Sequence, residues 1–197
     1  MHKVINCFKE DNPVIQKKLK EVTLDEGLHI AKDLLNVLAK RKDGIGLAAN
    51  QIGIDAAVAV VNVREPIILI NPEIISKNTE IPYYEGCLSF PGKGYHTKRY
   101  ETVEVTSENV EGSMIFSGVD SSENDKELRT LEVVCVQHEI DHLNGMRILD
   151  REVDTTIRVG KKIGRNEKVL IACGVESKVM KYKKAIPLLE NGWVLVE

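Results

Sequence analysis

One segment of the chain, residues 126–143, constrains the fold more than any other. Its apolar side chains and two histidines recur at steps of three or four, as on one face of an α-helix; they are Leu128, Leu131, Cys135, His138 and His142. Gly145 follows at a position suited to a left-handed helix cap. Such a face is stable only when another layer covers it. We therefore expect an α+β domain in which small mixed or antiparallel sheets wrap around this central helix.

Several short segments predict the strands of those sheets. Residues 56–62 and 67–71 are apolar and rich in β-branched side chains, which is typical of buried strands. Residues 73–81 are a third candidate. In residues 101–107 apolar and polar side chains alternate, as in an antiparallel strand with one solvated face, and residues 110–116 are its expected partner.

A second helix is predicted over residues 23–41. Thr23 and Glu26 have the spacing of a capping box at its start, and Gly44 and Gly46 end the helical pattern. The residues expected on its buried face are Leu24, Leu28, Ala31, Leu35 and Leu38.

The histidine helix contains the motif HExxH at residues 138–142. Two histidines four positions apart project from one helix face and can bind one metal ion, and Glu139 between them is placed to act on a water molecule held there. The alternative is a pair of hydrogen-bonded histidines with no metal. An unpaired imidazole pair on an apolar face is costly, which favours the metal.

A cysteine motif, EGCLS, occupies residues 85–89. A lone cysteine is more often a small buried hydrophobe than a ligand. Cys87 is nevertheless flanked by Gly86, Pro91 and Gly92, which indicates a turn that can present a thiolate. Two histidines and one cysteine would leave the fourth position of a tetrahedral site open, as catalysis requires.

A third motif, GIGLAANQ, occupies residues 44–51. Its two glycines allow close approach of the backbone to a ligand, and the amide of Gln51 can stabilise a developing oxyanion. It is not a phosphate loop, because the required lysine is missing. Taken alone, it could also be a turn that ends a helix.

Three motifs thus occur in the order GIGLAANQ, EGCLS and QHEIDHLNG. Together they resemble the signature motifs of the peptide deformylase family, over roughly residues 10–152. The resemblance implies a sheet-rich α+β domain with the HExxH helix at its centre. It also implies a metal-dependent hydrolase that removes the N-formyl group from the initiator methionine of nascent polypeptides and releases formate. The implied cofactor is one divalent metal ion, with Fe²⁺ as the expected native metal and Zn²⁺, Ni²⁺ or Co²⁺ as alternatives.

The same resemblance implies roles for individual residues. The metal ligands would be Cys87, His138 and His142. Glu139 would be the general base and then the general acid, while Gln51 and the backbone N–H of Leu88 would hold the formyl oxygen. Glu85 would pair with Arg99 and support the cysteine loop. The residues that line the peptide-binding cleft would be Ile45, Gly46, Gly86, Leu131, Val134 and Cys135.

Two rival functions remain to be weighed. A zinc endopeptidase shares HExxH and would need a downstream third ligand, for which Asp150 and Glu152 are the candidates; it leaves EGCLS and GIGLAANQ without a role. A non-catalytic binding module would have the fold without the activity. It is disfavoured because every motif residue needed for chemistry is present.

Charge divides the chain into an expected catalytic domain, residues 1–157, and a basic C-terminal tail, residues 158–197. The segment from Arg158 to Lys184 contains nine basic and two acidic residues and so carries a local charge of +7, although the whole chain has a net charge of -3. The overall charge argues against general nucleic-acid binding, and we expect no specific DNA partner. The tail is either a solvated face or a surface that docks on the ribosome.

The sequence also predicts a compartment. No apolar run approaches the roughly 20 residues that span a bilayer, so no membrane segment is expected. The first residues lack the apolar core of a secretory signal. Cys7, Cys87, Cys135 and Cys173 are widely separated and are expected to be free thiols or ligands. These features favour a cytoplasmic protein.

Overall fold

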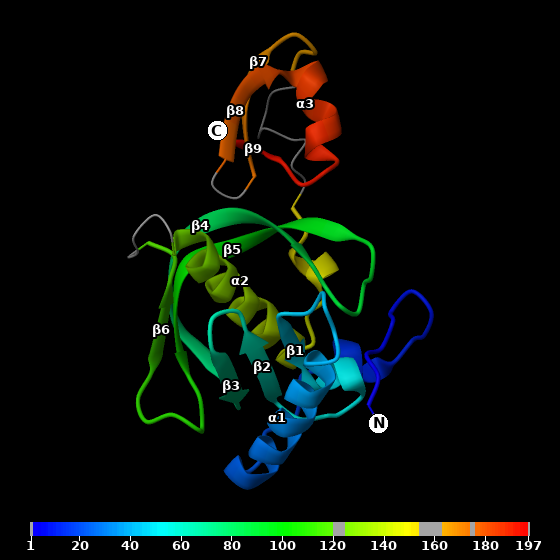
Figure 1. Ribbon diagram of the computed structural model, residues 1–197, viewed down its shortest axis with the longest axis vertical. Helices are drawn as coiled ribbons and strands as arrows, with labels where there is room; N and C mark the ends of the chain where they lie inside the picture. The colour runs from blue at the N-terminus through cyan, green and yellow to red at the C-terminus, as the bar shows by residue number, and fades with distance from the viewer. Residues whose placement is uncertain (1, 120–124, 154–162, 174–175, 197) are drawn as a thin grey trace.

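The computed structural model describes residues 2–119, 125–153, 163–173 and 176–196. Three small antiparallel sheets and three α-helices make up the described part, and α2 runs through its centre (Figure 1). This confirms the expected α+β fold. The helices are α1 (Leu24–Leu38), α2 (Lys126–Leu143) and α3 (Tyr182–Leu189), with 3₁₀ turns η1 (Pro13–Gln16), η2 (Ala49–Ile52) and η3 (Ile148–Arg151). The strands are β1 (Gly46–Ala48), β2 (Val58–Asn62), β3 (Pro66–Ile70), β4 (Glu73–Gly86), β5 (Gly94–Thr106), β6 (Met114–Ser117), β7 (Lys168–Cys173), β8 (Glu176–Lys181) and β9 (Val194–Val196).

The first sheet, in the order β1-β2-β3, is covered on both faces. Successive side chains of a strand point to opposite faces, and β2 uses both. Val58 and Val60 join the core that contains α1, whereas Ala59 and Val61 join the core that contains α2. This double burial explains why the predicted strand is continuously apolar rather than alternating.

Helix α1 presents a different face to this sheet from the one predicted. Leu24 and Leu28 are 43% and 44% exposed, so their predicted burial is wrong. The helix instead approaches β3 at Gly27, where a Cβ atom would lie 2.7 Å from the side chain of Ile70. Because Gly27 has no side chain, α1 lies closer to β3 than a helix face carrying Leu24 and Leu28 could. The residues of the helix that are buried are Gly27, Ala31, Leu34 and Leu38.

The two long helices have the expected end signals. Thr23 Oγ1 accepts a hydrogen bond of 3.4 Å from the Glu26 N–H at the start of α1, although that helix ends three residues earlier than predicted. After α2, Gly145 has φ of 73°, and the Met146 N–H donates to the Asp141 carbonyl at 2.9 Å. This is a left-handed cap of the Schellman type. None of the helices in the described ranges is long and apolar enough to cross a membrane.

The second sheet, in the order β4-β5-β6, arches over α2 (Figure 1). Val103 and Val105 of β5 are fully buried while Thr102, Glu104 and Thr106 beside them are not, as the alternating pattern predicted. The expected partner strand is β6, which begins a few residues later than predicted. In the first half of α2, Leu128 is 45% exposed, so its predicted place on the buried face is wrong. The sheet covers α2 only from its second turn onward.

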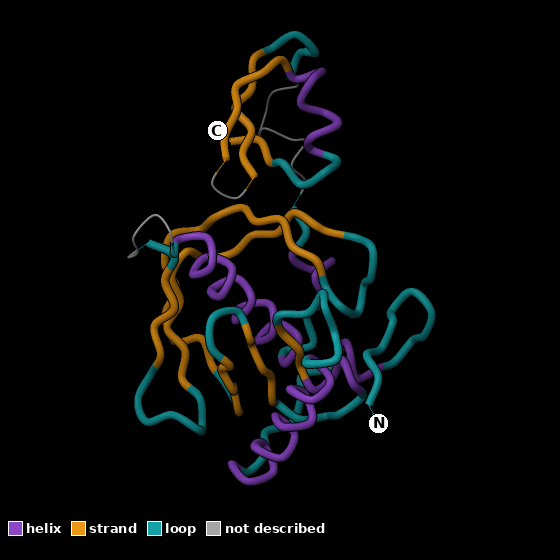
Figure 2. The backbone as a smooth tube through the Cα atoms, viewed as in Figure 1, coloured by secondary structure: helices purple, strands orange, loops and turns teal. Residues whose placement is uncertain are grey.

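The C-terminal unit, residues 163–173 and 176–196, is a small sheet in the order β8-β7-β9 with α3 beside it (Figure 2). It has its own core, built around Val169, Ile171 and Ala185. The predicted domain boundary at residues 157 and 158 lies outside the described residues, as do Arg158, Lys161 and Lys162.

Candidate metal centre

Three side chains from two of the motifs meet beside α2. Cys87 Sγ and one ring nitrogen each of His138 and His142 all lie within 4.8 Å of one another, and all three residues are buried. Cys87 Sγ is 3.3 Å from His142 Nε2. Ligands about 2.0–2.3 Å from one tetrahedral ion lie roughly 3.5 Å apart, so this spacing fits a shared metal.

The orientation of each imidazole leaves one nitrogen for a metal. His138 Nδ1 lies 2.9 Å from Glu85 Oε2, so its N–H donates to the carboxylate and Nε2 remains available. His142 turns Nε2 to Cys87, and Asn50 Nδ2 donates to its backbone carbonyl at 2.7 Å. Among the described residues, Glu139 Oε2 is buried without a hydrogen-bond partner. A cation with a bound water would supply the polar partner that this carboxylate lacks.

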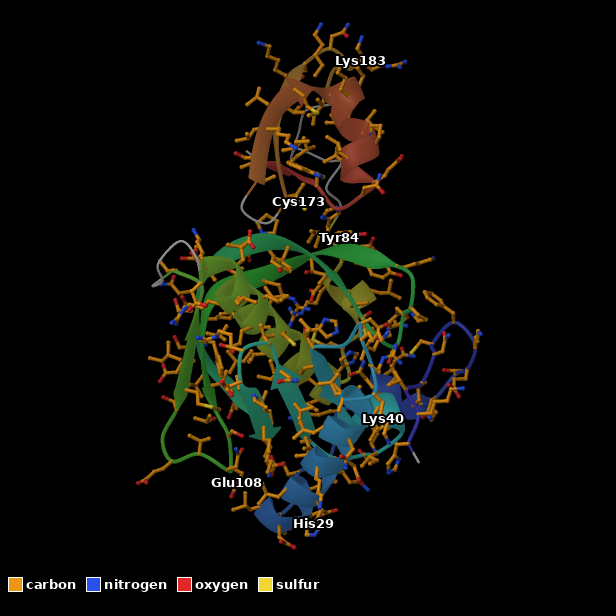
Figure 3. All side chains as sticks on the ribbon, in the orientation of Figure 1. His29, Lys40, Tyr84, Glu108, Cys173 and Lys183 are labelled. Carbon is orange, nitrogen blue, oxygen red and sulfur yellow. The ribbon has the colours of Figure 1, made fainter. Side chains whose placement is uncertain are left out.

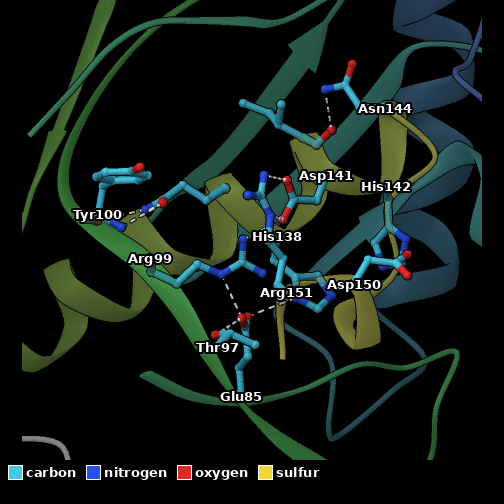
Figure 4. A network of polar contacts seen from close by, with 12 residues as sticks. Glu85, Thr97, Arg99, Tyr100, His138, Asp141, His142, Asn144, Asp150 and Arg151 are labelled. Atoms are coloured by element: carbon cyan, nitrogen blue, oxygen red, sulfur yellow. Dashed lines mark hydrogen bonds and ion pairs between the residues drawn. The ribbon is translucent and has the colours of Figure 1, made fainter. Parts of the chain in front are cut away.

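A chain of ion pairs fixes Glu85 behind the histidine (Figure 4). Glu85 Oε1 accepts hydrogen bonds from Arg99 Nε at 2.6 Å and from Thr97 Oγ1 at 2.5 Å. The guanidinium of Arg99, only 2% exposed, also donates to Asp141 at 2.5 Å, and Arg151 pairs with the other oxygen of Asp141 at 2.8 Å. The predicted pairing of Glu85 with Arg99 is confirmed.

The electrostatics of the site follow from burial and from these contacts. Burial alone would raise the pKa of Glu85, but the hydrogen bond and charge of His138, with Arg99, lower it to about 2. Burial raises the pKa of Glu139 to about 7, although His138 opposes the shift. Burial and then the charge of His138 hold the pKa of His142 well below its ordinary value. His142 is therefore neutral, which is the state that binds metal.

Close packing against Gly46 positions Glu139. A Cβ atom at Gly46 would lie 2.3 Å from Glu139 Oε1 and 2.6 Å from Cys135 Sγ. Only a residue without a side chain therefore lets β1 pass this close to α2. Gly46 was predicted to let the backbone approach a ligand. In the structure its missing side chain also makes room for the carboxylate of Glu139.

A cleft of about 370 Å³ opens onto these residues. Of the twelve residues predicted for the site, all but His142 line it, and His142 lies behind them, 1% exposed. The lining residues that were predicted are Ile45, Gly46, Gln51, Gly86, Cys87, Leu88, Leu131, Val134, Cys135, His138 and Glu139.

The comparisons with known proteins agree with this geometry. The sequence profile of the family described as polypeptide deformylase matches residues 4–157, more than half of the chain. The chain belongs to the peptide deformylase family. It is therefore a metal-dependent enzyme that removes the formyl group from nascent peptides, and a non-catalytic binding module is the wrong function.

Individual deformylases show the extent of the similarity. The peptide deformylase of Dictyoglomus thermophilum is 38% identical over 159 residues, which are 78% of this chain and 96% of that one. The crystal structure of the peptide deformylase from Thermotoga maritima has a TM-score of 0.64 and 28% identity, covering 78% of this chain and 99% of that one. A deformylase from Synechococcus elongatus, solved with actinonin, has a TM-score of 0.63 and 31% identity, covering 78% and 79%.

The rival ligand assignment of an endopeptidase finds no support in this deformylase. Asp150 is paired with Arg147 at 2.9 Å, and the group of metal-binding side chains in the described part of the chain contains neither Asp150 nor Glu152. The third side chain of that group is Cys87.

Several residues of the site were not predicted from the sequence. The contact between Glu85 and His138 joins residues 53 positions apart, and no local pattern announces it. Tyr83 and Tyr84 also line the cleft. Their position directly before EGCLS was a signal that could have placed them there, because residues next to a ligand motif lie near the same site and aromatic side chains commonly line such clefts.

Arg99→Met is expected to lower the free energy of unfolding by about 3–5 kcal/mol, because it leaves the buried carboxylate of Glu85 without its guanidinium. Urea denaturation of the metal-loaded protein measures this loss. Lys98→Met is the matched control on the same strand: its side chain is 55% exposed beside Glu80, and removing such a pair costs about 0–1 kcal/mol. Equal losses in the two variants would contradict the assigned importance of the buried network.

Proposed function

We propose that Cys87, His138 and His142 hold a single divalent cation and that Glu139 transfers the proton in deformylation. The observation that carries the proposal is the cluster of three ligand atoms within 4.8 Å, beside a buried carboxylate oxygen that lacks a protein partner among the described residues. The thiolate and imidazole donors suit a transition metal or zinc rather than magnesium or calcium.

The residues divide the chemistry between them. When bound, the cation supplies a Lewis acid that polarises the formyl carbonyl and lowers the pKa of water. Glu139 accepts a proton from the attacking water as its oxygen adds to the formyl carbon. The same carboxyl then donates that proton to the nitrogen of the methionine as the carbon–nitrogen bond breaks. The products are formate and a free amino terminus.

Gln51 and the backbone N–H of Leu88 are proposed to stabilise the oxyanion. Gln51 is held in the site because its Oε1 accepts from the Ala48 N–H at 2.9 Å, which directs its amide nitrogen toward Ser89 Oγ at 3.2 Å and Cys87 Sγ at 3.6 Å. Loss of one oxyanion donor lowers kcat by about 10²- to 10³-fold in other enzymes. Gln51→Leu, assayed with its metal content checked, tests this role.

Formate release from formyl-Met-Ala-Ser by protein loaded with Fe²⁺ or Ni²⁺ tests the proposal directly. Release of one formate per free amino terminus formed is the expected result. Well-folded, metal-loaded protein that releases none would overturn it, and cleavage of an unblocked peptide at an internal bond would revive the endopeptidase.

We also propose that Fe²⁺ is the native metal, with Zn²⁺, Ni²⁺ or Co²⁺ able to occupy the same ligands. An Fe²⁺ site with a thiolate ligand is open to oxidation by O₂. The Fe²⁺-loaded enzyme is therefore expected to lose activity faster in air than under argon, while the Ni²⁺-loaded enzyme decays equally in both. Equal decay of the Fe²⁺ form in the two atmospheres would dispose of this assignment.

A ribosome-binding role for the C-terminal unit is a further part of the proposed function. Lys168 and Lys181 stand directly opposite each other on β7 and β8, a like-charge pairing that an anionic partner would relieve. Lys183 extends beyond them at the outer end of the molecule (Figure 3). Charge reversal at Lys181 and Lys183 should weaken cosedimentation with ribosomes, whereas reversal at Lys32 of α1 and at Lys40 just after that helix should not. If both charge-reversed variants sediment with ribosomes equally, the surface around Lys181 and Lys183 does not bind the ribosome. The argument for a cytoplasmic, ribosome-associated enzyme then fails as well.

A further inference from the structure

The C-terminal unit contacts Tyr84, an aromatic side chain at the outer lip of the substrate cleft. This tyrosine lies near the end of β4, three residues before Cys87, and it lines the cleft. Figure 3 shows it on the side of the main domain that faces the C-terminal unit. Tyr84 is 39% exposed, so part of its surface remains accessible to a bound peptide.

Two glycines from distant parts of the chain enclose the ring of Tyr84. A Cβ atom at Gly94 of β5 would lie 2.4 Å from the Tyr84 Cζ atom, and one at Gly192 of the C-terminal unit would lie 3.0 Å from its Cδ1 atom. Gly192 has φ of 96°, a conformation that favours glycine. The ring therefore occupies a slot that exists because both positions lack side chains.

His96 completes this slot and ties it to the C-terminal unit. His96 pairs with Tyr84 across β4 and β5, and the two ring centroids are 4.8 Å apart. His96 Nε2 lies 3.4 Å from the backbone carbonyl of Leu189, the last residue of α3. The imidazole thus packs against the tyrosine ring at an interplanar angle of 51° and donates to a carbonyl of the C-terminal unit.

We propose that the C-terminal unit positions Tyr84 as part of the peptide-binding lip and that Tyr84 contacts substrate residues beyond the formylated methionine. The alternation of β4 supports this division. Glu85 points inward to His138, so the neighbouring Tyr84 lies on the opposite face of the strand, away from the metal ligands. A side chain there meets a peptide where it leaves the cleft rather than at the reacting bond. The inference rests on the deformylase activity and adds a specificity-determining residue to it.

An aromatic ring held on both sides is suited to this task. It presents a rigid apolar surface and loses little conformational freedom when a peptide packs on it. A contact of this kind strengthens binding of longer substrates without touching the formyl group. It should therefore change KM and leave kcat unaltered.

Tyr84→Ala is the first test, with formyl-Met-Ala and formyl-Met-Ala-Ile-Ser as substrates. The KM for the tetrapeptide is expected to rise about 5- to 30-fold, while the KM for the dipeptide and both kcat values stay at the wild-type level. Tyr84→Phe keeps the ring and should retain the wild-type KM for both peptides. A tetrapeptide KM that is unchanged in Tyr84→Ala would overturn the proposal.

Gly192→Val tests the positioning by the C-terminal unit, and the chain offers a matched control. Gly112, in the turn before β6, has φ of 80°, but a Cβ atom there meets nothing within 4 Å. Valine strains the backbone at both positions, yet only at Gly192 does it also press on Tyr84. Gly192→Val is expected to raise the tetrapeptide KM as Tyr84→Ala does, and Gly112→Val to leave it unchanged.

The dipeptide separates failure of this inference from failure of the enzyme's assignment. If wild type releases formate from formyl-Met-Ala and Gly192→Val has the same tetrapeptide KM as Gly112→Val, positioning by the C-terminal unit is refuted while the deformylase activity stands. If wild type releases no formate from either peptide, the function falls and the inference falls with it.

Discussion

Glu139→Gln is expected to lower kcat for formate release by about 10²- to 10⁴-fold, because the amide cannot accept the proton of the attacking water. Glutamine keeps the volume of the side chain that packs against Gly46 and Cys135, so the loss reports chemistry rather than packing. Initial rates with formyl-Met-Ala-Ser measure the effect, and the bound metal is counted in the same samples.

Glu127→Gln is the matched control for this substitution. Glu127 lies in the first turn of the same helix and is exposed. Its replacement should leave kcat and metal content unchanged. A Glu139→Gln variant that keeps more than about one tenth of wild-type kcat with its metal in place would remove Glu139 from the proton transfer, since a general base contributes at least about 10²-fold.

His142→Ala is expected to abolish metal binding and activity together. The loss of affinity should exceed the roughly 10- to 100-fold that follows removal of an outer partner of a ligand, because a ligand itself is lost. Elemental analysis of metal per chain after dialysis, with formate release from the same preparation, measures both. His29→Ala is the control: that histidine lies on α1 with its side chain 77% exposed. Full metal occupancy in His142→Ala would refute the assigned ligand set.

The sequence predicted the elements whose patterns are local. The bounds of α2 were predicted correctly because its apolar period and its glycine cap both act within a few residues. The buried face of α1 was predicted wrongly, because Gly27 allows an approach to Ile70 that no period of leucines reveals. The strands of the C-terminal unit are short and were not predicted, since three to six residues are too few to establish a period.

The candidate site divides in the same way. The side chains of Cys87, His138 and His142 come together as predicted, because the residue types and the local spacing within each motif already identify possible metal ligands. The partners of those residues were not all predictable. Glu85 and His138 meet only because β4 folds across α2, and Tyr84 meets Gly192 only because the C-terminal unit returns to the cleft. Contacts between distant segments depend on the fold, which a local pattern does not contain.

The ion pairs that run from Arg151 through Asp141 and Arg99 to Glu85 can be completed only in a fixed order while the chain is being synthesised. The ribosome makes the cysteine motif first, the histidine helix next and Arg151 only afterwards. Until that last arginine emerges, Asp141 has one of its two guanidinium partners and the support of His138 is incomplete. A nascent chain is therefore expected to complete the proposed metal site only after residue 151, and arrested chains that stop before this residue should retain metal less well than those that extend past it.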